Sequence, residues 1–404
     1  MSDKIRQDAF QKRMKRTVIA RQHNFFAVVS PGFLDVCYSE LCRIQNPPIE
    51  QIEKSTGGVS FVGYLHDAYY LNLMSRTATR ILMRIAEFKA VHFKELEHKL
   101  SDIPWEYFLI SSNPLYIRIH VSTSKSKLYH KSAIAERIYS SIAARFLSLS
   151  HQSTNESIQT NSFTTYQNIF GRMVNDRFTV SIDTSGDLLY KRGIKRFVGK
   201  APLRETTAAA ILYKAGYTPG MPLIDPMCGS GTFSIEAAMI SKSIPPGWFR
   251  NFAFMQWPCF REKRWQYLKR VAGENRIRFT RPHIVSLDID ELASNILKQT
   301  ILDFSLSDVI QVIHDDFFNI SPRDFFDKPG LVMINPPYGI RLKEHADMNA
   351  FITSVGNRLV SHYHGWRAAL ILPRHMSSPI TSPHHVFPFV HGGLDMNLVC
   401  FKIQ

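Results

Sequence analysis

The sequence predicts an α/β fold with a mostly parallel sheet in residues 200–404, preceded by an α+β region. After about Gly199, short apolar runs alternate with turns and helical segments, which is the rhythm of a sheet covered by helices on both faces. Before that point, strand-like runs, turns and helical segments follow one another irregularly. A length of 404 residues leaves room for two or three compact units.

The N-terminal half begins with a basic arm. Residues 1–22 hold seven Lys and Arg against two Asp, which predicts a mobile arm that either contacts nucleic-acid phosphate or is only a solvated tail. Residues 151–162 are polar and predict an exposed loop. The spacing of apolar residues predicts strands over 25–29, 58–62, 115–121, 178–182 and 188–190, and helices over 34–42, 69–87 and 133–149.

In the C-terminal half, polar residues stand at the ends of predicted strands. These strands cover 222–225, 283–288, 309–314, 331–334 and 368–372, and a helix is predicted over 232–241. Asp225, Asp288, Asp316 and Asn335 lie at or just after the ends of the first four strands. Ligands of parallel α/β sheets bind beyond the carboxyl ends of the strands. We therefore expect these four side chains to share one ligand crevice.

Charge and cysteine content narrow the class of protein. Lys and Arg number 49 against 34 Asp and Glu, a net charge of +15, which favours a nucleic-acid partner, although solubility alone is the alternative explanation. The five cysteines are scattered without zinc-type spacing, so we expect reduced thiols and no metal site. We find no signal peptide and no stretch of 18 apolar residues, and we expect a cytoplasmic protein without a membrane span.

The features at the strand ends are typical of a nucleoside-bearing cofactor. The first is the turn Asp225-Pro226-Met227-Cys228-Gly229-Ser230-Gly231-Thr232, whose glycines let a ligand approach the backbone. It lacks the third glycine of a dinucleotide site and the lysine of a phosphate loop. Asp288 can accept hydrogen bonds from ribose hydroxyls, with Ile289 against an adenine ring. Asp315-Asp316-Phe317 can bind the adenine amine and pack on the ring, although any one of these acids alone is more often a helix cap.

Asn335-Pro336-Pro337-Tyr338 predicts the chemistry. The exocyclic amine of a base is a weak nucleophile, because its lone pair is delocalised into the ring. The Asn335 side-chain oxygen and the Pro336 carbonyl can accept its two hydrogens and direct the lone pair at a methyl group. Proline rings stiffen this backbone, and Tyr338 can stack on an unpaired base. A proline-stiffened turn without catalytic role is the alternative.

In this order along the chain, the four motifs resemble those of class I, Rossmann-like amino-methyltransferases. More narrowly, residues 191–193, 201–211 and 392–395 look like segments of bacterial 23S rRNA guanine-N2 methyltransferases of the RlmL type. The resemblance implies a ferredoxin-like plus THUMP RNA-binding region over 23–199 and a single S-adenosylmethionine-dependent methyltransferase domain over 200–404. It implies 23S rRNA or the assembling large ribosomal subunit as partner. An N6-adenine methyltransferase and an inactive RNA-binding assembly factor are the alternatives.

The resemblance also assigns roles to individual residues. Asn335, Pro336, Pro337 and Tyr338 would hold the target guanine. Apart from the resemblance, interleaved basic and aromatic residues between 248 and 270 suit contacts with unpaired RNA, or else a solvated basic face over a folded-back aromatic cluster. RNA contacts are expected from Arg250, Arg261, Arg264 and Arg341, whereas the aromatic residues between 248 and 265 are expected to fold back onto the catalytic core. The expected cofactor residues are Leu203, Thr206, Asp225, Pro226, Met227, Cys228, Gly229, Gly231, Thr232, Asp288, Ile289, Asp315, Asp316, Phe317 and Asn335.

Overall fold

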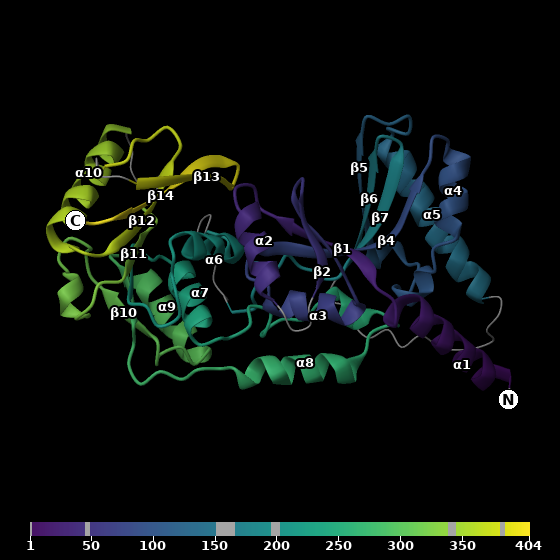
Figure 1. The fold of residues 1–404 in the computed structure, drawn as a ribbon, viewed down its shortest axis with the longest axis horizontal. Coiled ribbons are helices and arrows are strands. Elements are labelled where there is room, and N and C mark those ends of the chain that lie inside the picture. The colour runs from purple at the N-terminus through teal and green to yellow at the C-terminus, as the bar shows by residue number, and fades with distance from the viewer. Residues whose placement is uncertain (1, 45–48, 151–165, 195–202, 338–344, 380–383) are drawn as a thin grey trace. The chain divides into compact units, whose positions relative to one another are not determined.

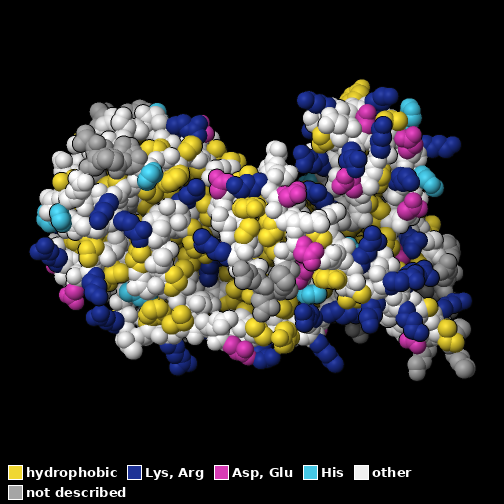
Figure 2. All heavy atoms as spheres, viewed as in Figure 1, with side chains coloured by type: hydrophobic (Ala, Val, Ile, Leu, Met, Phe, Trp, Pro, Cys, Tyr) yellow, Lys and Arg dark blue, Asp and Glu magenta, His cyan; other side chains and the backbone are white. Residues whose placement is uncertain are grey.

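The computed structural model describes residues 2–44, 49–150, 166–194, 203–337, 345–379 and 384–404, and its chain forms two compact units. The first unit contains Met1–Val29, Tyr38–Leu189 and Arg250–Arg270, and the second contains Ser30–Cys37, Tyr190–Phe249 and Val271–Gln404. The chain therefore passes between the units more often than the single expected boundary near residue 199. Figure 1 shows the elements of both units, and Figure 2 shows Lys and Arg side chains spread over the visible surface.

The first unit is built on one seven-stranded sheet, with the strand order β2-β3-β1-β4-β7-β6-β5. Neighbouring strands are antiparallel except β5 and β6, which are parallel. The strands are β1 (His23–Val29), β2 (Glu50–Ser55), β3 (Gly58–Gly63), β4 (Ala78–Lys89), β5 (Ile117–Ser124), β6 (Gln167–Val174) and β7 (Arg177–Asp183).

Helices of the first unit cover one face of strands β5, β6 and β7. In α5, Ile134, Ile138 and Ile142 are four residues apart and fully buried, as expected for a helix with one apolar stripe against a sheet. Figure 1 shows α4 and α5 on the same side of these strands. The helices are α1 (Ser2–Met14), α2 (Leu34–Arg43, which starts in the second unit), α3 (Leu65–Met74), α4 (Phe93–Ser101) and α5 (Lys131–Ser150), with short helical turns at Lys15–Ile19, Trp105–Tyr107 and Pro114–Tyr116.

Three predictions for this half were wrong. The helix predicted over 69–87 is the end of α3 followed by strand β4, because the Glu40 carboxylate binds the connecting turn, accepting from the Arg76 amide at 2.7 Å and from the Thr77 amide at 3.1 Å. Residues 188–190 form no strand. The expected mobile arm is helical, and its Met14 and Val18 are buried. The loop predicted over 151–162 lies outside the described residues.

Residues Arg250–Arg270, here called the inserted segment, belong to the first unit although both flanking stretches belong to the second. The Phe254 ring stacks on Tyr69 with centroids 4.3 Å apart, and Trp257 Nε1 donates to Gln167 Oε1 at 2.7 Å. Phe252, Phe254, Trp257 and Trp265 are therefore buried as expected, but in the first unit and not on the catalytic core. Trp248 and Phe249 belong to the second unit, where the Phe249 ring lies 5.0 Å from the Phe304 ring.

The second unit has a seven-stranded sheet in the order β10-β9-β8-β11-β12-β14-β13. Strands β10 to β12 run parallel, and β14 and β13 complete the sheet as an antiparallel pair. The strands are β8 (Leu223–Pro226), β9 (Ile284–Asp288), β10 (Ile310–His314), β11 (Leu331–Ile334), β12 (Arg367–Pro373), β13 (His384–His391) and β14 (Leu394–Lys402). The five predicted strands of this half are β8 to β12, so the predicted α/β class is confirmed.

Helices bury this second sheet. All ten residues of α7 are buried, and α10 packs on the sheet through Ile352, Val355 and Leu359. Within the described residues, none of the helices is both long and apolar enough to cross a bilayer. The helices are α6 (Glu205–Lys214), α7 (Thr232–Ser241), α8 (Glu262–Glu274, which starts in the first unit), α9 (Glu291–Asp303) and α10 (His345–His362), with helical turns at Ala253–Gln256 (in the first unit) and Pro322–Asp324.

Candidate functional site

The chain order of the second sheet creates a switch point between β8 and β11. Strands β9 and β10, which follow β8 in the chain, lie on one side of β8 in the sheet. Strands β11 and β12, which come next, lie on its other side. Ligands of open α/β sheets bind at such a point, beyond the carboxyl ends of the strands. Leu331 pairs with Leu223 and Val332 with Ile224, so β8 and β11 end side by side. Asn335 therefore follows β11 next to the strand end that carries the glycine turn.

The turn after β8 is held in a left-handed backbone conformation. Met227, Gly229 and Gly231 have φ angles of 79°, 52° and 70°. The amides of Met227 and Cys228 both donate to the Leu287 carbonyl, at 2.8 and 2.9 Å, which fixes the turn against β9. A positive φ is costly for methionine, and a strained residue held in this way is often found at a functional site.

The two glycines of the turn are needed for different reasons. A Cβ on Gly231 would lie 2.4 Å from Leu297 Cδ1, so this glycine allows close packing on α9. A Cβ on Gly229 would meet no atom within 4 Å, so open space lies in front of this residue. Gly229 therefore leaves room for a ligand against the backbone.

The Asp225 carboxylate forms hydrogen bonds to a neighbouring helix of the same unit. It is buried, and its Oδ2 accepts from the Ser234 amide at 3.2 Å and from Ser234 Oγ at 2.7 Å, while Ser286 Oγ donates to Ser234 Oγ at 2.7 Å. Neither serine is among the predicted site residues. Ser234 could have been found from its position in the first turn of the helix after Asp225. A hydroxyl at that position can donate a hydrogen bond to the acid at the strand end. Pro226 and Thr232, on either side of the turn, are also buried.

Asp288 connects the end of β9 to the glycine turn. Its Oδ2 accepts from the Gly229 amide at 2.6 Å, and its Oδ1 accepts from the Asp290 amide at 2.9 Å. Each carboxylate oxygen keeps acceptor capacity for a second donor. The neighbouring Ile289 is 71% exposed, which is unusual for an isoleucine and leaves its side chain available to a ligand ring.

The loop after β10 lies against the same strand end. The Asp315 amide donates to the Asp288 carbonyl at 3.3 Å. Asp315 Oδ1 accepts from Asn319 Nδ2 and from the Asp316 amide, and these hydrogen bonds lower the pKa of the Asp315 carboxyl below its ordinary value. Asp316 Oδ1 accepts from the Phe318 amide at 3.0 Å. Phe317 is 3% exposed and belongs to the hydrophobic core.

Two further groups also bear on the site, the half-buried Cys228 of the turn and the buried Thr206 of α6. Burial, followed by the nearby charges of Asp225 and Asp288, raises the pKa of the Cys228 thiol well above its ordinary value, so Cys228 stays protonated. Thr206 Oγ1, in the first turn of α6, is buried and has no hydrogen-bond partner among the described residues. A buried hydroxyl without a partner is costly and is the kind of group a ligand satisfies. Leu203, just before α6, is buried as well.

The remaining predicted residues fall into three places. Pro336 is buried and Asn335 and Pro337 are half-buried after β11, whereas Tyr338 and Arg341 lie outside the described residues. Arg250 donates to the carbonyls of residues 185, 187 and 188 within the first unit, so its guanidinium supports the fold there. Arg261 and the exposed Arg264 also belong to that unit. Their RNA contacts stay predictions, and we find no cluster of metal ligands in the described part of the chain.

Comparisons with known proteins find similarity over both halves of the chain. Residues 192–379 match the family model of the RMKL-like methyltransferase domain, and residues 24–82 match that of the RlmL ferredoxin-like domain. The chain is 30% identical, over 94% of its length, to "Ribosomal RNA large subunit methyltransferase K/L" of Syntrophotalea carbinolica, of which it covers 53%. The chain thus spans about half the length of this relative.

Two further similarities extend over whole proteins. A protein of Synechocystis named "Putative RNA methyltransferase" is 28% identical over 94% of this chain and 96% of its own length. The crystal structure of SMU.472, "a putative methyltransferase complexed with SAH", is 27% identical and superposes with a TM-score of 0.78 over 95% of this chain and 99% of its own.

Proposed function

Because the chain carries an RMKL-like methyltransferase domain over residues 192–379 and an RlmL ferredoxin-like domain over 24–82, we propose that it methylates ribosomal RNA. The methyl donor is S-adenosylmethionine, and the acceptor is the exocyclic N2 amine of a guanine in 23S rRNA, free or within the assembling large subunit. The observation that carries this proposal is the adjacency of the ends of β8 and β11. It brings Asn335, which follows β11, beside a glycine turn with open space in front of it.

The residues around the turn fit the cofactor. Asp288 has acceptor capacity for the two ribose hydroxyls, and the exposed Ile289 side chain can lie against adenine. The open space at Gly229 accepts the methionine part close to the backbone. Thr206 offers a buried hydroxyl without a partner among the described residues. When bound, the cofactor supplies an electrophilic methyl group on a sulfonium centre.

The tetrapeptide prepares the amine. Asn335 Oδ1 and the Pro336 carbonyl accept one amine hydrogen each, which withdraws the nitrogen lone pair from the ring and points it out of the plane of the base. Both acceptors are set by the proline-stiffened backbone before the base arrives, so they need no rearrangement during the reaction. The nitrogen becomes acidic only once it is methylated, and its proton then leaves to solvent. Tyr338 stacks on the unpaired base.

The test is methyl transfer to rRNA from cells that lack the gene, followed by mass spectrometry of the nucleosides. We expect N2-methylguanosine. Asn335→Ala should lower kcat about 100- to 1,000-fold, as for the loss of one preorganised transition-state contact, with the affinity for S-adenosylhomocysteine unchanged. Asn357→Ala, on the exposed side of α10, is the matched control and should keep full activity.

Other outcomes would redirect the proposal. N6-methyladenosine in the product would identify adenine as the target, since Asn-Pro-Pro-Tyr also suits that amine. Absence of transfer to any rRNA, together with intact RNA binding, would indicate an assembly factor instead of an enzyme. Full activity of Asn335→Ala would remove Asn335 from the mechanism.

A further inference from the structure

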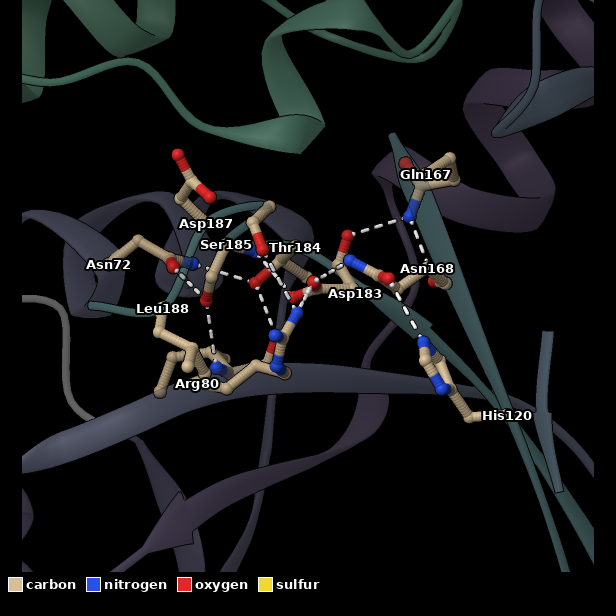
Figure 3. A network of polar contacts seen from close by, with 12 residues as sticks. Asn72, Arg80, His120, Gln167, Asn168, Asp183, Thr184, Ser185, Asp187 and Leu188 are labelled. Carbon is tan, nitrogen blue, oxygen red and sulfur yellow. Dashed lines mark hydrogen bonds and ion pairs between the residues drawn. The ribbon is translucent and has the colours of Figure 1, made fainter. Parts of the chain in front are cut away.

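Two ion pairs of this chain lie inside the fold and hold its segments together. Figure 3 shows the one in the first unit, where Arg80 pairs with the fully buried Asp183 and Asn168 Nδ2 donates to the same carboxylate at 3.1 Å. In the second unit, Arg192 and Glu236 are 3% and 0% exposed, and Nε of the arginine donates to Oε1 of the glutamate at 2.9 Å. Neither pair is open to a ligand.

An ion pair of a different kind joins the ends of β12 and β14. Arg374 Nη1 donates to Asp395 Oδ2 at 3.1 Å, although the two side chains are 50% and 59% exposed. The Arg374 amide also donates to the Asp395 carbonyl at 3.0 Å, which continues the pairing of the two strands by one residue. An exposed ion pair contributes little to stability, so the fold does not depend on these two side chains.

The pair stands at the same edge of the sheet as Asn335. The carboxyl ends of β11, β12 and β13 and the beginning of β14 meet there, because β14 runs antiparallel to its neighbours. Ile334, the last residue of β11, pairs with Leu370, whereas β12 continues to Pro373. With about 3.3 Å per residue, Arg374 lies roughly 10 Å beyond the level of Asn335 along the strands. Strands β12 and β14 therefore form a wall beside the end of the shorter β11.

Both side chains follow the sheet face that α10 covers. Ile334 of β11, Leu372 of β12 and Val399 of β14 belong to the hydrophobic core on that face. Side chains alternate along a strand, so Arg374 and Asp395 lie on the same face, just past the core. The ion pair is thus on the face of the sheet to which the last residue of β11 points.

The pair keeps most of its hydrogen-bonding capacity. Among the described residues, the Arg374 side chain uses one N–H group and the Asp395 side chain uses one oxygen, Oδ2. Asp395 Oδ1 remains as an acceptor, and the guanidinium keeps most of its N–H donors. The ion pair fixes this acceptor and these donors next to each other, so a ligand meets them at a set spacing.

Guanine carries complementary groups in the matching order. Its N2 amine, its N1–H and its O6 lie in a row along one edge of the base, two donors followed by an acceptor. With the amine at Asn335, the N1–H can donate to Asp395 Oδ1 and O6 can accept from Arg374. Adenine held by its own amine presents N1, an acceptor, where guanine has the N1–H, and a carboxylate repels an acceptor.

We propose that Arg374 and Asp395 select guanine over adenine, by binding O6 and the N1–H of the base whose amine lies at Asn335. The inference rests on the proposed function and deepens it. It assigns the choice of base to residues outside the tetrapeptide at 335–338, which suits the amine of either purine. The two side chains bind the edge of the base and take no part in the transfer of the methyl group.

The test is the binding of two nucleotides to the chain saturated with S-adenosylhomocysteine, measured by saturation-transfer NMR titration. One is guanosine 5′-monophosphate. The other is the monophosphate of 2,6-diaminopurine riboside, which keeps the N2 amine but has an acceptor at N1 and an amine in place of O6. We expect wild type to bind the guanine nucleotide about tenfold more tightly, the effect of one hydrogen bond to a charged group. Asp395→Asn should lose most of this preference, because an amide can accept from guanine N1–H or donate to diaminopurine N1.

Three further variants complete the design. Arg374→Gln should weaken binding of the guanine nucleotide about 5- to 10-fold, and Arg374→Lys should restore part of the loss, since an ammonium group can still donate to O6. Asp327→Asn is the matched control. It removes an exposed carboxylate ahead of β11, at the opposite edge of the sheet, and should leave both affinities unchanged.

The outcomes separate this inference from the proposed function. Equal binding of the two nucleotides by wild type, no binding of the guanine nucleotide at millimolar concentration, or an unchanged preference in Asp395→Asn each overturns the inference, even when the chain produces N2-methylguanosine. Binding requires no methyl transfer, so a guanine preference that Asp395→Asn abolishes supports the inference even if no rRNA is methylated. Far-ultraviolet circular dichroism confirms that each variant is folded, since the substituted side chains are exposed.

Discussion

The Asp288→Asn variant tests the cofactor crevice most directly. The carboxylate accepts from the Gly229 amide at 2.6 Å and from the Asp290 amide at 2.9 Å, and it retains capacity for the ribose. A side-chain amide keeps one oxygen and replaces the other with a donor. One of the two backbone N–H groups then faces an NH₂ group, and the ribose loses an acceptor.

The magnitude follows from these contacts. Loss of one hydrogen bond to a charged group costs about 1.5–3 kcal/mol. In binding free energy this is roughly a 10- to 150-fold rise in the Kd for S-adenosylhomocysteine. The unpaired backbone amide should also lower the free energy of unfolding by about 1–3 kcal/mol.

Calorimetric titration with S-adenosylhomocysteine measures the effect, and Asp290→Asn is the matched control. Asp290 accepts from the Leu292 and Ala293 amides as the N-cap of α9, a role that asparagine fills about as well. The control removes the same charge two residues away and should bind with about the wild-type Kd. Equal affinity of Asp288→Asn and wild type would refute the ribose role. Equal weakening in both variants would show that local charge, and not the hydrogen bond, is responsible.

Five further substitutions, in three experiments, test other parts of the structure. Gly229→Ala should weaken cofactor binding, measured by calorimetry, and should lower the free energy of unfolding by about 1–2 kcal/mol because of its positive φ. Gly231→Ala should lower the free energy of unfolding more, because its Cβ also clashes with Leu297, and urea denaturation compares the two variants. Thr206→Val should leave or raise the unfolding free energy of the free protein and weaken cofactor binding about fivefold; stronger binding would contradict the assigned contact. Arg250→Ala should lower stability by about 2–3 kcal/mol and speed amide exchange in the inserted segment, whereas the exposed Arg264→Ala should change neither.

Much of the second unit could be predicted from the sequence, because its signals are local. Short apolar runs that end in an acid or an asparagine mark β8 and β11, and the structure reproduces both within one residue. Parallel strands bring their carboxyl ends to one edge of the sheet, so the order of the motifs was enough to expect a common crevice.

The contacts that depend on distant residues could not be predicted. Glu40 binds the turn between α3 and β4, although it lies more than thirty positions earlier in the chain. Apolar spacing alone therefore does not reveal where α3 ends. Phe317 follows an acid at a strand end, where an adenine contact was expected, yet its ring packs in the core. Most aromatic residues of the inserted segment are expected to be buried, but their sequence does not predict which of the two units buries them.

By itself, the sequence determined the strand ends and the glycine turn after β8, since each depends on neighbours within a few residues. Only the tertiary structure decided which side chains serve the fold and which face solvent. It shows that Asp225 is bound by Ser234, and that the pairing register places Arg374 beside Asp395. The physical reason is that hydrogen-bond partners and strand register are set by packing between segments far apart in the chain, which local periodicity does not encode.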